Sequence, residues 1–497
     1  MNVLTKHSER HMKKLFIAFL SVGFLASCTE VLEDVEPSTS VSFETALTSA
    51  DAVEAIRTSM YSKKRGSFDF TTEYFIGPAA LADLTSNRPG SSRFQGLNEA
   101  FGTSGTVHIG SFSGYEVIQE ANLLINGIAD GVIDQATMDR YRGEAYAARA
   151  FANHRMATTY GYEPGTAAAS SWNLSIILRE EATLDLAQAT PLPRNTIAEV
   201  YAAIKSDLAQ AKSLLSGVNS DNGYVTEAFV EGIAARVHLY AGEYSQAISA
   251  AEAAISKSGR TLVTTEEGVA TMFRGPNPEA LFEMVVNKDT EPIAGSNTNS
   301  GPVSYTSDQW VAQVPTNELI NKYEAGDWRV AGWHGDCISE QTVGATANGC
   351  ELVNDLAVSI TKFNGWKGNL SQDLVYMRVA EMYLILAEAS AKASNNPAAG
   401  VPYLNELRAA RGVGAVPAEA TANMTAFEDF ILDERARELA IEGHRFFDLK
   451  RLERDIPNSL GGIKMRKDSY RILAPFGIGL QNVNPLLVEN PGYEVAN

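Results

Sequence analysis

Apolar residues recur with a helical period over most of the chain. In EAFVEGIAARVHLYAGEYSQAISAAEAAI, small and large apolar residues return every three to four positions on either side of Gly242. Alanine faces let two helices approach closely, and the glycine permits a tight turn between them. The pattern predicts helix pairs that must stack on their neighbours, because one pair cannot bury its own apolar face.

The spacing within this pair is typical of a tetratricopeptide repeat. The positions that match are Ala235, Leu239, Gly242, Tyr244, Ala247, Ala251 and Ala254. Related helices contain Gly143, Ala147 and Ala150, and one long final helix is expected over residues 427–452. The sequence therefore predicts an all-α scaffold of degenerate helix pairs, at about residues 114–161, 195–257, 376–412 and 424–453.

Two loop-rich excursions interrupt the helices, at about residues 62–113 and 258–375. They are rich in Gly, Ser, Thr, Asn and aromatic residues, and short apolar runs such as EALFEMVVN indicate strands or buried turns. Because a rigid scaffold positions loops for binding, we expect any ligand site to lie in these excursions.

The N-terminal pattern differs from the rest of the chain. Lys13 and Lys14 precede an apolar run at residues 15–26, which as a helix is about 18 Å long and too short to cross a bilayer. Leu-Ala-Ser-Cys at residues 25–28 resembles a bacterial lipobox, with Cys28 as the acylated residue. We expect a lipoprotein signal peptide at residues 1–27, an acidic tether at 28–40 and one domain at 41–497; an incidental apolar run with a stray cysteine is the alternative.

The formal net charge of −19 argues against nucleic acid or an anionic bilayer as the partner, because no Lys/Arg cluster supplies a basic face. The excess of acidic residues either keeps the protein soluble or favours the approach of neutral or cationic ligands. Cys337 and Cys350 flank a Gly-containing loop and predict a disulfide in an exported protein. His334 and Asp336 beside Cys337 are a weaker case for a metal site, and we expect no metal and no cofactor.

The segment ILDERARELAIEGHRFFDLKRL, residues 431–452, carries the densest charge. Glu442 and His444 invite interpretation as metal ligands or an acid/base pair, but residues two apart on a helix point in different directions. We expect partly buried ion pairs instead. The sequence shows no nucleophile elbow, P-loop, zincin motif or dinucleotide-binding glycine loop, and so predicts no enzyme; a glycosidase with distant carboxylates stays a minor alternative.

This C-terminal segment closely resembles the signature of the SusD/RagB family of outer-membrane, nutrient-binding lipoproteins of Bacteroidetes. Three further stretches match in the family's order: PRNTIAEVYAAIKSDLAQAKSLL, NELINKYEAGDWR and VYMRVAEMYLILAEA. The ending NVNPLLVENPGY is also similar. One departure lies after TTYG, where an Ala/Ser insertion replaces the usual acidic residue and Val-Pro.

The resemblance implies a helical scaffold with an irregular binding face. It also implies a lipid-anchored, non-catalytic subunit at the surface of the outer membrane, which captures oligosaccharides and passes them to a SusC-like TonB-dependent transporter. Two alternatives remain: a peptide-capturing subunit like RagB, or an assembly subunit that keeps the transporter closed.

Sugar binding requires flat aromatic faces together with amide or guanidinium groups. Any single candidate side chain is also consistent with a role in the core or in capping a helix. Trp328 is excluded from the candidates because it belongs to a structural Asp-Trp-Arg turn. The candidates in the two excursions are Phe68, Phe70, Asn87, Arg88, Arg93, Phe94, Tyr305, Trp310, Trp333 and Trp366.

Overall fold

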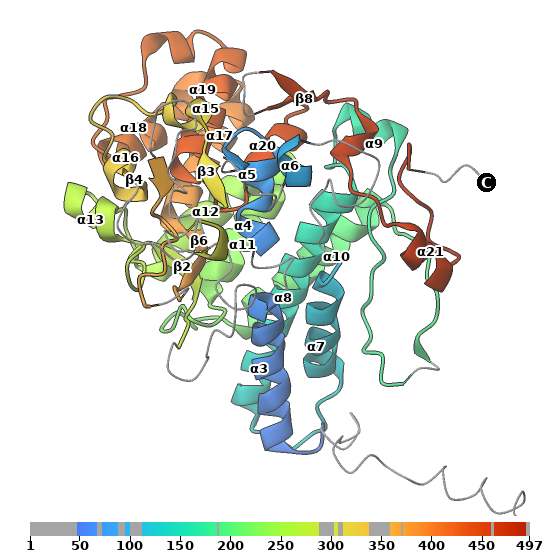
Figure 1. The fold of residues 1–497 in the computed structure, drawn as a ribbon. Coiled ribbons are helices and arrows are strands. Elements are labelled where there is room, and N and C mark those ends of the chain that lie inside the picture. Colours follow the sequence, from blue (N-terminus) through green and yellow to red (C-terminus); the bar gives the residue numbers. More distant parts are fainter. Residues whose placement is uncertain are drawn as a thin grey trace, which may run out of the picture.

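The computed structural model describes most of the chain after residue 46 (Figure 1). The described residues are 47–66, 72–87, 95–99, 112–185, 188–287, 303–306, 312–336, 358–368, 371–458 and 462–493.

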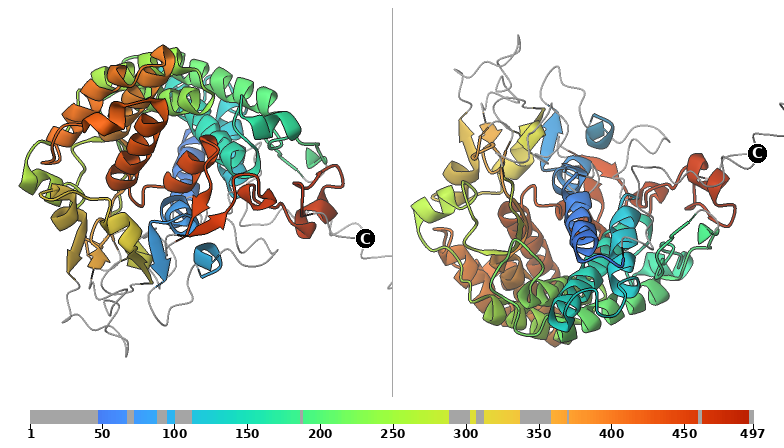
Figure 2. Two further views of the ribbon diagram at one scale, coloured as in Figure 1. Left: turned by 90° about the horizontal axis from the view of Figure 1, so that it is seen from above. Right: turned by 90° about the horizontal axis from the view of Figure 1, so that it is seen from below.

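Long helices form the frame of the molecule. Consecutive members pack side by side, α3 on α7, α7 on α8, α8 on α10, α10 on α11, α11 on α12 and α12 on α17. Seen from above and below, most of these helices form an arc around the shorter elements, and α3 (blue) lies on its inner side (Figure 2). The frame helices are α3 (Ala50–Gly66), α7 (Gly114–Asn126), α8 (Gln135–Tyr160), α10 (Ile197–Leu214), α11 (Glu227–Tyr240), α12 (Tyr244–Ser258), α17 (Val379–Ser394), α18 (Val401–Ala409), α19 (Met424–Glu438) and α20 (Arg445–Arg451).

Local sequence explains where these helices begin and how closely they pack. Thr196 and Glu199 form a capping box at the start of α10, with the Thr196 side chain accepting from the Glu199 amide. Gly242 adopts φ +70° in the turn between α11 and α12, a conformation that favours glycine. Gly143 on α8 lies so close to Leu215 that an added Cβ would be 2.7 Å from its Cγ. The prediction of closely packed helix pairs is confirmed.

Shorter elements cover the inner side of the arc. Among the described residues the strands form four two-stranded antiparallel sheets, β1–β3, β2–β6, β4–β5 and β7–β8. The run EALFEMVVN contains strand β2, which settles the choice between strand and buried turn. The strands are β1 (Thr85–Asn87), β2 (Ala280–Met284), β3 (Gln313–Pro315), β4 (His334–Asp336), β5 (Val358–Ile360), β6 (Leu374–Arg378), β7 (Ile456–Pro457) and β8 (Ile463–Met465). The short helices are α4 (Thr72–Phe75), α5 (Gly77–Leu81), α6 (Gln95–Glu99), α9 (Ala167–Ser171), α13 (Glu266–Thr271), α14 (Val303–Thr306), α15 (Asn317–Ile320), α16 (Trp328–Trp333) and α21 (Ile478–Val483), with 3₁₀ turns at Pro397–Ala399, Ala418–Thr421 and Tyr470–Ile472.

The single final helix expected over residues 427–452 is wrong. The chain forms α19 and α20 with a turn between them, in which Ile441 has φ +64° and Gly443 has φ +90°. Gly443 fits there because a Cβ would lie 2.4 Å from the carbonyl oxygen of Tyr74. The positive φ of Ile441, unusual for a β-branched residue, is held by burial of its side chain to 1% exposure. The apolar stripe proposed for one continuous helix is therefore divided between two.

Candidate functional site

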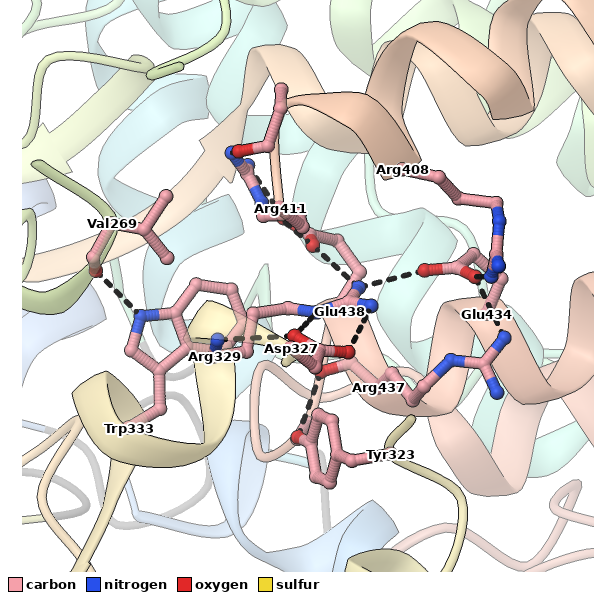
Figure 3. A network of polar contacts seen from close by, with 12 residues as sticks. Val269, Tyr323, Asp327, Arg329, Trp333, Arg408, Arg411, Glu434, Arg437 and Glu438 are labelled. Atoms are coloured by element: carbon pink, nitrogen blue, oxygen red, sulfur yellow. Dashed lines mark hydrogen bonds and ion pairs between the residues drawn. The ribbon is translucent and has the colours of Figure 1, made fainter. Parts of the chain in front are cut away.

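Buried charges join the C-terminal helices to the loop-rich part of the chain (Figure 3). Glu438, at the end of α19, accepts hydrogen bonds from Arg329 at 2.9 Å, from Arg411 at 2.8 Å and from Arg378. All four side chains are fully buried. Because three guanidinium groups surround one carboxylate, the charge of Glu438 is compensated inside the protein.

Glu434, one helical turn earlier, extends the same network. It accepts from Arg329 and Arg437 at 2.7 Å and from Arg408 at 2.9 Å. Burial raises the pKa of this carboxyl, but the three arginines outweigh burial and lower the pKa to about 2. The predicted ion pairs are confirmed here, and they are fully rather than partly buried.

Glu442 and His444 are both buried. Glu442 accepts from Arg378 Nε at 2.8 Å and from Lys362. His444 is buried, and burial with four nearby arginines lowers its pKa well below the usual range. No group of three His, Cys, Asp or Glu side chains suited to a metal ion occurs in the described part of the chain.

Trp333 lies in the core. Its indole is 1% exposed, and Nε1 donates to the carbonyl of Val269 at 3.0 Å (Figure 3). Phe273 packs edge-on against the ring, and Lys362 Nζ lies 4.1 Å from the ring centroid. A buried ring has no face open to a ligand, so its place in the structure corrects the expectation that Trp333 binds one.

Trp366 lies at the surface in the segment between β5 and β6. The side chain is 36% exposed, and Nε1 donates to the carbonyl of Thr361 at 3.1 Å. The guanidinium of Arg274, in the turn after α13, lies 4.6 Å from the ring centroid. The structure thus presents an oriented indole and a planar cation together at the surface, next to the end of α13 (Figure 1).

Asn87 belongs to an amide cluster at the β1–β3 pair. Its Oδ1 accepts from Gln313 Nε2, which also donates to Asn98 Oδ1 at 3.0 Å. Asn98 in turn donates to the carbonyls of Ala80 and Thr85. These contacts hold the first and second excursions together, and Asn87 remains half-buried at the end of β1.

Most other predicted site residues lie outside the described residues. These are Cys28, Phe68, Phe70, Arg88, Arg93, Phe94, Trp310, Cys337 and Cys350. Tyr305 belongs to α14, and its side chain is not described. Their binding roles, the lipid attachment and the disulfide stay predictions.

A cavity of about 260 Å³ lies between α7, residues 176–184 and the C-terminal segment. Phe112, Tyr115 and Leu480 contribute apolar walls. Its polar side chains are already engaged, since Gln119 exchanges two hydrogen bonds with the backbone of Thr183. The cavity is therefore apolar and lacks the free amides that a sugar requires.

A second, polar cleft of about 550 Å³ lies beside α19 and α20. Two of its carboxylates are paired, Asp429 with Arg454 at 2.9 Å and Asp433 with Lys322 at 2.7 Å.

No helix in the described part of the chain is long and apolar enough to span a membrane.

Two family models match the chain. A SusD family model matches residues 357–493, and a model described as "Starch-binding associating with outer membrane" matches residues 32–239. The chain belongs to the SusD/RagB family. The resemblance noted in the C-terminal segment is confirmed.

Individual relatives agree with this family over almost the whole chain. SusD-like protein P38 of Formosa agariphila is 25% identical over 528 residues, covering 96% of this chain and 98% of the relative. A SusD superfamily protein of Bacteroides thetaiotaomicron has a TM-score of 0.74 at 22% identity, covering 89% of this chain and 100% of that one. A laminarin-binding SusD-like protein has a TM-score of 0.69 at 21% identity, covering 90% and 100%. The predicted all-α, tetratricopeptide-like fold of the SusD type is confirmed.

Proposed function

We propose that this SusD/RagB-family protein binds oligosaccharides at the cell surface and delivers them to a SusC-like TonB-dependent transporter. The family model that names starch binding and outer-membrane association supports the carbohydrate ligand and the location. The laminarin-binding neighbour supports the same class of ligand. Lipid on Cys28 would tether the domain, and the role is capture without catalysis.

One observation of the structure supports sugar binding most directly, the exposed and oriented indole of Trp366. The hydrogen bond from Nε1 to Thr361 fixes the ring, so little side-chain entropy is lost when a sugar packs on it. The apolar C–H face of a pyranose can pack on the uncovered part of the ring, while Arg274 donates to hydroxyl groups. Asn87 remains a second candidate at the β1–β3 pair.

Calorimetric titration of the full chain with laminarin and starch oligosaccharides tests this proposal. We expect measurable, weak binding that Trp366→Ala reduces about tenfold, as the loss of one stacking contact implies. Trp172→Ala is the matched control, because Trp172 also bonds through Nε1, to Asn490, and also lies near an arginine. Trp172 follows α9, which lies across the molecule from α13 (Figure 1). An equal loss in both variants, or none in Trp366→Ala, would contradict a binding role for this surface.

Peptide capture, as in the RagB branch, is the second candidate. The polar cleft beside α19 and α20 is the observation that favours it, since carboxylates suit a basic peptide. Internal ion pairs already neutralise Asp429 and Asp433, which makes the cleft a weaker site than its composition indicates. Binding of oligopeptides without binding of any glycan would replace the sugar proposal by this one.

A further inference from the structure

We propose that Arg274 and Trp366 together bind a sugar residue that carries an anionic group, either a carboxylate or a sulfate. This inference rests on the proposed function and narrows its ligand class. Its basis is the state of Arg274, an exposed arginine whose guanidinium contacts an aromatic ring and, among the described residues, no carboxylate.

Arginine side chains elsewhere in the protein are mostly paired with carboxylates. Acidic residues outnumber basic ones by 60 to 41, so acidic partners are abundant. Even exposed or partly exposed arginines such as Arg454 and Arg466 have a partner, Asp429 at 2.9 Å and Asp455 at 3.4 Å. Arg179, Arg194 and Arg260 have no carboxylate partner among the described residues either, but their guanidinium groups donate to backbone carbonyls. Arg274 differs from them because its side chain is exposed and its described guanidinium contact is an aromatic ring.

The surroundings of Arg274 leave its charge uncompensated. Lys367, next to Trp366, is already bonded to Asp373 at 2.5 Å. Arg260 donates to the carbonyls of Asn277 and Pro278. In the part of the chain that the structure describes, no carboxylate forms an ion pair with either arginine.

The geometry suits an anionic sugar better than a neutral one. The guanidinium carbon of Arg274 lies over the indole, and a guanidinium that stacks on a ring keeps its N–H edges free to donate. Two parallel N–H groups match the two oxygens of a carboxylate or sulfate, and these charge-assisted bonds are about twice as strong as neutral ones. The net charge of −19 repels an anion at a distance, but salt screens that repulsion over about 8–10 Å and leaves the local contact decisive.

Paired probes that differ in charge test the proposal on the full chain. The carboxylated pair is hexagalacturonate and its methyl ester, and the sulfated pair is a κ-carrageenan hexasaccharide and its desulfated form. We expect at least one anionic probe to bind about tenfold more tightly than its neutral counterpart, as an added charge-assisted contact implies. The arm that shows the preference identifies the anionic group.

Arg274→Gln should abolish that preference, because it should lower the affinity for the anionic probe far more than the affinity for the neutral one. Arg274→Lys should restore only part of it, since an ammonium lacks the planar fork. Arg471→Gln is the control, because Arg471 also lies over an aromatic ring, that of Tyr470, but near the C-terminal segment. Urea midpoints equal to that of the parent protein would establish that the variants are folded.

The outcomes separate this inference from the proposed function. Equal affinity for charged and neutral probes, unchanged by Arg274→Gln, overturns the anionic ligand and leaves glycan binding intact. Failure of laminarin, starch oligosaccharides and all four probes to bind overturns the proposed function and this inference together.

Discussion

Trp333 and Trp366 each lie beside a cationic side chain, but in opposite environments. The Trp333 ring is 1% exposed with Lys362 Nζ 4.1 Å from its centroid, whereas the Trp366 ring is 36% exposed with the Arg274 guanidinium at 4.6 Å. Lys362 is bonded to Glu442 and to two backbone carbonyls. The guanidinium of Arg274 has only the ring among its described contacts.

Both tryptophan–cation pairs have the aromatic contact, so that contact does not distinguish them. The other partners of the cation distinguish the structural pair at Trp333 from the pair proposed to bind ligand at Trp366. Around Trp333 the charges are balanced internally, so the pair contributes to the frame. Beside Trp366, the exposed guanidinium of Arg274 has no described carboxylate partner. Water solvates this charge at little cost in stability, and the guanidinium is available to an anionic ligand. The predictions below test this contrast.

Replacing Glu438 by Gln should give the largest effect. The change removes the carboxylate shared by Arg329, Arg378 and Arg411. The buried network then lacks one negative charge, although each arginine keeps another carboxylate, Asp327 for Arg329 and Glu279 for Arg378 and Arg411. We expect a loss of about 3–5 kcal/mol in the free energy of unfolding, measured by urea denaturation. Glu428→Gln is the control, since Glu428 pairs with Lys392 and Arg454 in a partly exposed position, and should cost about 0–1 kcal/mol. Similar losses in the two variants would mean that the buried network does not hold the frame.

Replacing Trp333 by Phe should have the next largest effect. The smaller ring leaves a void and deprives the Val269 carbonyl of its donor. The lost packing and the unsatisfied carbonyl together predict a loss of about 2–3 kcal/mol in the free energy of unfolding. Trp366→Phe should change it by less than about 0.5 kcal/mol, because that ring is partly exposed. A larger loss in Trp366→Phe than in Trp333→Phe would reverse the roles assigned to the two rings.

The spacing of apolar residues was sufficient to predict the helical frame. It was less successful for the buried C-terminal helices. Alanine spacing and Gly242 predicted the α11–α12 pair, because both act locally. The break between α19 and α20 was missed, although Gly443 was a visible signal, since the apolar spacing continued across it.

The candidate site was harder to predict for a physical reason. Glu434 and Glu438 lie on one helix, but their partners come from 26 to 109 residues away, with Arg437 the only near neighbour in sequence. Trp333 and Trp366 look alike in sequence, because burial depends on the fold around them. Arg274 has no sequence signal at all, since what distinguishes it is the absence of a described carboxylate partner.

The smallest expected effect concerns Glu283, which lies beneath the turn that carries Arg274. Its carboxylate accepts from the Asn277 amide at 2.8 Å, and burial with nearby Asp373 raises its pKa to about 7, despite the opposing influence of Lys367 and Arg260. Between pH 4.5 and 7 the folded state therefore retains a proton that the unfolded state has lost. The stability from this group is complete below pH 4.5 and is lost as the pH rises through 7.

We accordingly expect the parent protein to lose about 1–2 kcal/mol more than Glu283→Gln between pH 5.5 and pH 7, as a pKa raised by this much implies. Urea denaturation at the two pH values measures the difference. Glu434→Gln is the matched control from the buried network, because a pKa of about 2 leaves that carboxyl ionised throughout this range and makes its cost the same at both pH values. A pH-dependent cost in Glu434→Gln, or none in Glu283→Gln, would show that the two regions do not differ in how their charges are balanced.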